Sequence, residues 1–149
     1  MDPTYRVFII VNRSRHEVFE AVADPRELSA YFTTGGASGR LMPGSTVTWD
    51  FHDFPGAFPV RVSEVVPDEL IVLHWKTNEP GTDYQVEVAM RFSDVGEGRT
   101  KVEVAESGWR DTDAATRASY GNCMGWSQML AALKMWVEHR INLREGAYV

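Results

Sequence analysis

The sequence predicts an α+β fold in which a curved, six-stranded antiparallel sheet wraps around a long C-terminal helix. Between residues 46 and 104, apolar and polar side chains alternate in short runs separated by turn residues, which is typical of half-exposed antiparallel strands. From about Met124 to Arg144, apolar side chains recur every three or four residues, as on one stripe of a helix. Both apolar surfaces are buried when the helix lies across the sheet.

The N-terminal part predicts one strand followed by two short helices. Residues 4–11 are apolar and β-branched, as in a strand. Ser14 followed by Glu17, and Asp24 followed by Pro25, are signals for helix starts. The two short helices therefore come directly after the first strand, where they would hold one end of the sheet open.

The remaining elements follow from the same patterns. The Gly-rich segment 33–44 has no periodicity and is expected to be a loop. Gly121 and Asn122 predict a weak point between an initial helical turn or two and the main helix. The apolar stripe of that helix consists of Trp126, Met129, Leu130, Leu133, Val137 and Ile141.

Length and composition restrict the class of protein. The 149 residues fit a single domain, expected to span residues 1–149. A net charge of −6 without a Lys/Arg run argues against a nucleic-acid partner, because phosphate contacts need a basic face. No apolar run is long enough to cross a bilayer, and no basic segment precedes the first apolar stretch. We therefore expect a cytoplasmic protein without integral membrane association.

Four segments carry a resemblance to a known superfamily. They are "RSRHEVFEAVADPRELSAYF", "LIVLHWK", "GEGRTKVEVAESGW" and "GWSQMLAALKMWVE". In this order and spacing they resemble the START-like (SRPBCC) helix-grip superfamily, and within it the group named after the activator of the 90-kDa heat-shock protein ATPase. The resemblance implies a helix-grip fold with a pocket between the long helix, the sheet and the short helices.

The resemblance and the strand pattern together suggest which side chains line such a pocket. Pockets of this kind are mostly apolar. The expected ligand-binding residues are Tyr31, Phe32, Trp49, Phe51, Trp75, Met90, Phe92, Trp126, Met129, Leu133 and Trp136. The alternative is that the helix stripe is packed core throughout.

Glu106 is the most informative polar residue. It shares strand parity with Val102 and Val104, so it should point inward. An inward carboxylate needs hydrogen-bonding partners, and the hypothesis is that Glu106 anchors a polar group of the ligand. The alternative is that the strand is ending and Glu106 reaches solvent. Asp53 also has inward parity but abuts a turn, and is expected to be solvated.

These residues favour a non-catalytic protein that binds a small hydrophobic molecule, such as a lipid, a polyketide or an aromatic metabolite. The alternative from another class is a cyclase- or dehydratase-type enzyme in which Glu106 acts as acid or base and Tyr31 or Tyr120 positions the substrate. We expect no catalytic residue beyond this alternative and no cofactor. The four histidines are scattered along the chain, so no metal site is expected either.

A role as an interaction protein is the third hypothesis. The chaperone activators of the resembled group carry an additional N-terminal domain with an Asn-rich Trp-His-Trp signature, which has no counterpart here. Activation of the chaperone ATPase is therefore not expected. A sheet of this kind has edge strands, and one of them could pair across a homodimer.

Overall fold

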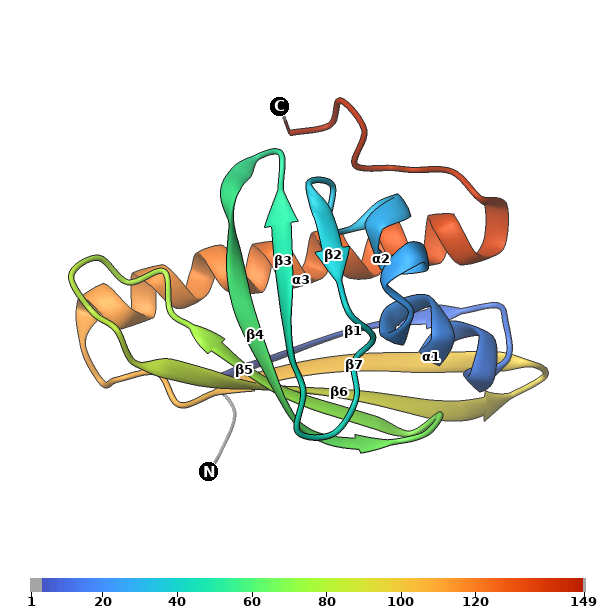
Figure 1. Cartoon of the computed structure of the whole chain (residues 1–149). Coiled ribbons are helices and arrows are strands. Elements are labelled where there is room, and N and C mark those ends of the chain that lie inside the picture. Colours follow the sequence, from blue (N-terminus) through green and yellow to red (C-terminus); the bar gives the residue numbers. More distant parts are fainter. Residues whose placement is uncertain (1–3, 149) are drawn as a thin grey trace.

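The computed structural model describes residues 4–148, apart from the side chains of residues 54 and 55. One sheet curves around a long helix, with two short helices at one end of the sheet (Figure 1). The predicted α+β helix-grip architecture is therefore confirmed. The elements are β1 (Tyr5–Val11), α1 (Arg15–Ala23), α2 (Pro25–Tyr31), β2 (Gly36–Ser38), β3 (Thr46–Phe51), β4 (Phe54–Val66), β5 (Leu70–Lys76), β6 (Gln85–Gly96), β7 (Arg99–Ser107) and α3 (Asp113–His139).

The sheet has seven strands rather than the six expected. Their order is β1-β7-β6-β5-β4-β3-β2, and all neighbouring pairs are antiparallel. The additional strand is β2, whose three residues pair with β3 inside the segment expected to be a loop. A three-residue strand is too short to show an alternating pattern, so the sequence could not reveal it.

The two short helices begin where their capping signals predicted. The Ser14 hydroxyl accepts a hydrogen bond from the backbone N–H of Glu17 at 3.3 Å. A carboxylate oxygen of Asp24 accepts one from the backbone N–H of Arg26 at 2.9 Å. Each cap satisfies an N–H group that has no partner within the helix, and so fixes the start of that helix.

Helix α3 differs from the expectation at both ends. It is continuous over 27 residues, roughly 40 Å, and passes through Gly121 and Asn122 without a break. Packing against the sheet outweighs the low helix propensity of these two residues, which is of the order of 1 kcal/mol each. The helix ends at His139, because Arg140 adopts a left-handed conformation with φ 56°. Ile141, expected on the apolar stripe, follows this cap and is 53% exposed.

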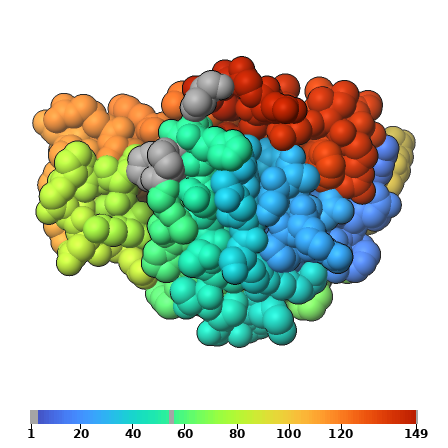
Figure 2. Space-filling model, turned by 45° about the horizontal axis from the view of Figure 1, so that its top comes forward, coloured from blue at the N-terminus to red at the C-terminus, as the bar shows by residue number. Residues whose placement is uncertain are grey.

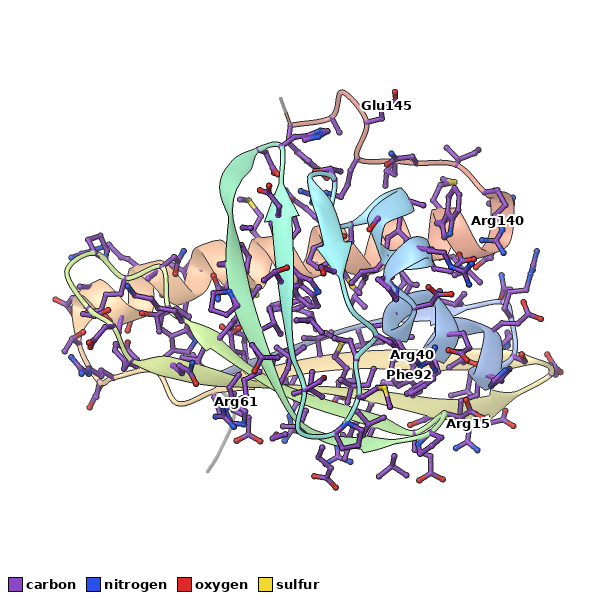
Figure 3. All side chains as sticks on the ribbon, viewed as in Figure 1. Arg15, Arg40, Arg61, Phe92, Arg140 and Glu145 are labelled. Carbon is purple, nitrogen blue, oxygen red and sulfur yellow. The ribbon has the colours of Figure 1, made fainter. Side chains whose placement is uncertain are left out.

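The core lies between α3 and the concave face of the sheet. The strands contribute Val47, Trp49, Val60, Val62, Leu73, Val88, Met90 and Val104, and the helix contributes Trp126, Met129, Leu130, Leu133 and Val137, all of them buried. Arg61 on the opposite face of β4 points away from α3 (Figure 3). The alternation predicted from the sequence therefore separates the core from the solvent-facing side. Within residues 4–148, no helix has the length and apolar character required to span a membrane.

The segment after α3 turns back over the rest of the molecule. It leaves the end of the helix and runs along the top of α2 and β3 (Figure 1). In the space-filling view, this red segment lies against side chains near residues 30 and 50 (Figure 2). It therefore brings residues 141–148 close to the open end of the sheet.

Candidate functional site

The larger cavity opens between the first half of α3 and the strands β3, β4 and β5. Its volume is about 530 Å³, which is within the size range of small-molecule sites. Half of its lining residues are aromatic or glycine, and most of the others are polar or charged. The lining includes Phe32, Phe51, Phe58, Trp75, Asn122, Gly125, Trp126 and Arg144.

Two glycines of α3 keep this cavity open. Gly121 and Gly125 lie four residues apart, so they occupy one face of the helix, and both line the cavity. A Cβ atom added to Gly125 would meet no atom within 4 Å. Space that a side chain would fill therefore remains available on this face of α3.

Glu106 lies beneath this cavity, fully buried, and accepts hydrogen bonds from three indole groups. Trp75 Nε1 donates to Oε2 at 3.3 Å, Trp126 Nε1 donates to Oε2 at 3.2 Å, and Trp109 Nε1 donates to Oε1 at 2.8 Å. An indole N–H can only donate, so both carboxylate oxygens serve as acceptors. The predicted inward direction of Glu106 is confirmed by its complete burial.

Two further donors complete the set around Glu106. The Tyr5 hydroxyl donates to Oε1 at 2.8 Å, and Asn122 Nδ2 lies 3.0 Å from Oε1 and 3.2 Å from Oε2. Every donor that the structure describes around Glu106 is neutral. Together these five side chains occupy both carboxylate oxygens.

Strand pairing and helix periodicity bring these donors together. Tyr5 of β1 lies opposite Glu106 of β7 in the sheet register. Asn122 and Trp126 are four residues apart on α3, so both side chains project from one face toward the carboxylate. Trp109 follows Gly108, whose φ of +96° turns the chain out of β7 and is readily adopted by glycine.

The surroundings of Glu106 also affect the acidity of Tyr5. Burial raises the pKa of the Tyr5 hydroxyl well above its usual value, and the nearby Glu106 carboxylate raises this pKa further. Tyr5 therefore keeps its proton and remains a donor to Glu106 at all moderate pH values.

An ion pair forms another part of the cavity wall. Arg144 Nη2 donates to both carboxylate oxygens of Asp53, at 3.0 Å each, and the Arg144 side chain is only 6% exposed. Its guanidinium lies 5.7 Å from the ring centre of Phe32 and 5.9 Å from that of Phe51. Asp53 is exposed in the turn after β3, as expected, but the C-terminal segment folds back and brings Arg144 to it.

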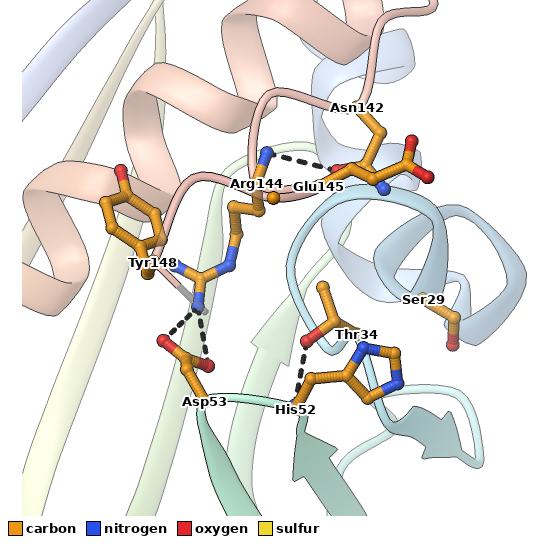
Figure 4. A pocket seen from close by; sticks show the side chains of 9 residues that line it. Ser29, Thr34, His52, Asp53, Asn142, Arg144, Glu145 and Tyr148 are labelled. Atoms are coloured by element: carbon orange, nitrogen blue, oxygen red, sulfur yellow. Dashed lines mark hydrogen bonds and ion pairs between the residues drawn. The ribbon is translucent and has the colours of Figure 1, made fainter.

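Arg144 and Asp53 also line a second, smaller cavity of about 310 Å³ (Figure 4). Thr34 and His52 lie on its far side, where the Thr34 hydroxyl accepts a hydrogen bond from the His52 backbone N–H at 3.0 Å. The Arg144–Asp53 ion pair therefore borders both cavities. Acidic and basic side chains are mixed in the smaller cavity, so its charge does not favour either an anion or a cation.

The structure divides the predicted ligand-binding residues into two groups. Phe32, Phe51, Trp75 and Trp126 line the larger cavity, and Glu106 supports it from beneath. The other predicted residues do not line it. These are Tyr31, Trp49, Met90, Phe92, Met129, Leu133 and Trp136, of which all but the half-buried Trp136 are buried.

Specific contacts explain where several of this second group lie. The Tyr31 hydroxyl donates to the Ala21 carbonyl at 2.9 Å, and the Phe92 ring packs edge-on against Phe19 of α1 at 5.4 Å, close to the short helices (Figure 3). Trp136 Nε1 donates to Glu27 at 2.7 Å. These contacts belong to the packing of α1 and α2 against the rest of the protein.

The hydroxyl that contacts Glu106 belongs to neither of the two tyrosines expected to act with this residue. Tyr31 was one candidate, but it bonds Ala21, and Tyr120, the other candidate, is 67% exposed on α3. The structure places Tyr5 at Glu106 instead. Sequence reasoning missed Tyr5 because the contact depends on which strand pairs with β7, although its position on an inward-facing strand was a usable signal.

Other functional side chains had weaker signals in the sequence. Asn122 was interpreted as a helix-weakening residue, and Arg144 as the end of the helix. Phe58 occupies a segment near a turn, in a strand that pairs irregularly with β3 at Trp49 and Phe51. Within residues 4–148, no cluster of three or more His, Cys, Asp or Glu side chains could hold a metal ion.

Comparisons with known proteins agree with this geometry. The family model described as "Activator of Hsp90 ATPase homolog 1-like protein" matches residues 12–138. No curated protein matches the chain. Among solved structures, DynU16, a protein in the dynemicin biosynthetic locus, is 25% identical with a TM-score of 0.76, and the match covers 92% of this chain and 48% of DynU16. The chain thus spans about half the length of DynU16.

Two further structures are similar over almost their whole length. The protein SSP2350 from Staphylococcus saprophyticus is 24% identical with a TM-score of 0.75, and the match covers 94% of this chain and 96% of SSP2350. The Aha1 dimer from Colwellia psychrerythraea is 22% identical with a TM-score of 0.72, with 90% and 95% covered. The chain therefore belongs to the family of Activator of Hsp90 ATPase homolog 1-like proteins and has the START/SRPBCC-type fold that its four motifs predicted.

Proposed function

We propose that this protein binds a small hydrophobic ligand in the larger cavity and does not act on it chemically. The observation that carries this proposal is the cavity of about 530 Å³ with five aromatic side chains in its wall, Phe32, Phe51, Phe58, Trp75 and Trp126. Apolar surface removed from water on binding contributes roughly 25 cal/mol per Å², so an aromatic wall of this kind favours an apolar guest. A lipid, a polyketide or an aromatic metabolite fits this description, and the similarity to a protein of a biosynthetic locus supports the same classes.

The arrangement around Glu106 supports binding rather than catalysis. A general acid or base must reach the reacting group of the substrate. The carboxylate oxygens of Glu106 are already engaged by five protein side chains, three of which, Trp75, Asn122 and Trp126, separate it from the cavity. Glu106 therefore serves to position the cavity wall, and not to contact the ligand as first hypothesised.

A neutral fluorescent probe tests this function directly. N-Phenyl-1-naphthylamine fluoresces strongly in apolar surroundings, so we expect saturable enhancement with the wild-type protein. Gly125→Leu should abolish most of the enhancement, because its side chain would project into the cavity. Ser127→Leu adds the same side chain at an exposed position of α3 that does not line the cavity, and should behave like the wild type.

Two results would contradict the proposal. One is the absence of saturable binding to the folded wild-type protein. The other is equal binding by the Gly125→Leu and Ser127→Leu variants, which would place the probe elsewhere. Independently of the probe, organic extraction of the purified protein followed by mass spectrometry would identify any ligand that it carries from the cell.

A further inference from the structure

We infer that the cavity selects a flat aromatic ligand that carries a protonated amine. This inference rests on the proposed ligand-binding function and specifies the chemistry of the ligand. Its basis is the relationship between the buried Glu106 and the three residues that lie between it and the cavity, Trp75, Asn122 and Trp126, here called the floor.

Glu106 is fully buried, and the structure describes neutral donors around it and no ion pair with a basic side chain. A buried negative charge without a counter-ion acts over a longer distance than a solvated one, because little water screens it. It therefore makes the floor of the cavity attractive to a cation.

Trp75 and Trp126 direct their N–H groups at Glu106, and their ring centres lie 5.2 Å apart with 37° between the ring planes. The faces of aromatic rings carry negative potential and attract cations. Hydrogen bonding to a carboxylate fixes the rings and adds negative charge behind them, so the two effects act in the same direction.

The hydrogen-bonding capacity of the floor also favours a cation. Glu106 engages the two indole N–H groups and one N–H of the Asn122 amide. Because Asn122 Nδ2 contacts both carboxylate oxygens, its carbonyl Oδ1 must point away from them; the opposite amide orientation would place two acceptors together. The floor therefore offers a ligand the Asn122 Oδ1 acceptor, which suits an ammonium group.

The other charged residues of the cavity do not cancel this preference. Arg144 is paired with Asp53 through both carboxylate oxygens, so this part of the wall has little net charge. Lys76 is exposed at the rim, where solvent screens it. The protein already contains a cation beside aromatic rings of this cavity, because the Arg144 guanidinium lies near the rings of Phe32 and Phe51.

Three probes with the same ring system and different charge test the inference. 1-Naphthalenemethylamine is a cation at pH 7, 1-naphthalenemethanol is neutral, and 1-naphthoate is an anion. We expect isothermal titration calorimetry on the wild-type protein to show the amine binding about tenfold more tightly than the alcohol, and the naphthoate binding most weakly. In spectra of the indole N–H groups, the amine should shift the signals of Trp75 and Trp126.

Variants then assign the preference to Glu106. Glu106→Gln should remove most of the tenfold ratio between the affinities for the amine and the alcohol, even where a disturbed wall lowers both affinities. Glu103→Gln removes the same charge from the opposite face of β7, and should retain the tenfold preference. If Glu106→Gln does not fold, the ranking of the three probes on the wild-type protein still decides the question.

The outcomes separate this inference from the function on which it rests. If the alcohol binds as tightly as the amine or more tightly, selection of a cation is wrong and hydrophobic binding stands. If none of the probes binds, and the neutral naphthylamine dye also fails to bind, the ligand-binding function is wrong as well. A preference for the amine that Glu103→Gln and Glu106→Gln reduce equally would overturn the assignment to Glu106.

Discussion

Tyr5 and Glu106 lie opposite each other on β1 and β7, and the Tyr5 hydroxyl donates a 2.8 Å hydrogen bond to Glu106 Oε1. This contact joins an edge strand to the residue that organises the cavity wall. Because the pair consists of a donor that must keep its proton and a buried acceptor, it makes the stability of the protein sensitive to alkaline pH.

The first prediction concerns Tyr5→Phe. Burial and the Glu106 carboxylate raise the pKa of Tyr5 in the folded state above its unfolded value of about 10. Its contribution to the free energy of unfolding is therefore fully present below about pH 10 and is lost as the pH rises further, by up to about 1.4 kcal/mol per pH unit. We expect urea unfolding of Tyr5→Phe to show a shallower loss of stability between pH 10 and 11.5 than the wild type.

Near pH 7 the same variant should be less stable than the wild type. Loss of a hydrogen bond to a buried carboxylate costs about 1.5–3 kcal/mol. The two stability curves should therefore converge as the pH rises. Parallel curves across the whole alkaline range would show that Tyr5 does not provide this pH dependence.

The second prediction compares substitutions of Glu106. Glu106→Leu leaves five donors without an acceptor, and Glu106→Gln directs an amide NH₂ at groups that also donate. Each unsatisfied buried polar group costs about 1–3 kcal/mol. We expect urea unfolding to show Glu106→Leu as the least stable variant, with Glu106→Gln between it and the wild type.

The matched control for this comparison is Glu103→Gln, which lies on the opposite face of β7 and should stay within about 0.5 kcal/mol of the wild type. If Glu106→Leu were as stable as the wild type, the donors would have found other partners, and Glu106 would not organise the wall.

The sequence could predict the parts of this site that depend on periodicity. Strand parity placed Glu106 inward, and the helix stripe placed Trp126 on the buried face of α3. Both predictions depend only on the geometry of one element, which repeats regularly along the chain.

Contacts between distant elements were not predictable in the same way. The Tyr5 contact depends on strand order, and the Arg144 contact depends on the path of the chain after α3. The separation of Trp75 from Trp49, one lining the cavity and the other packed behind it, depends on side-chain rotamers. Periodicity carries no information about these three features, which explains why the candidate site was only partly predicted.

The third prediction concerns the C-terminal segment held by Arg144. Asp53→Asn removes the charge that compensates a nearly buried guanidinium. Because residues 141–148 form no helix or strand, we expect them to detach before the whole protein unfolds, so that Arg144 regains water. Hydrogen exchange measured by mass spectrometry should become faster in the C-terminal peptide of Asp53→Asn and remain unchanged in peptides of the sheet.

Glu145→Gln provides the control for this experiment. It removes a charge from the same segment at an exposed position, and its exchange should match the wild type. Unchanged exchange in Asp53→Asn would show that the ion pair does not hold the segment in place.

The fourth prediction contrasts Gly125, which lies inside α3 and lines the cavity, with Gly108, which follows β7 with a positive φ. Gly125 lies inside α3 with no atom within 4 Å of an added Cβ, so Gly125→Ala should stabilise the protein by about 0.5–1 kcal/mol through helix propensity. Gly108 has a φ of +96°, which an alanine adopts only with strain, so Gly108→Ala should destabilise it by about 1–2 kcal/mol. Urea unfolding of both variants measures these opposite signs. If Gly125→Ala were instead destabilising, the added methyl group would have met a neighbour, and the face of α3 that borders the cavity would be closed rather than open.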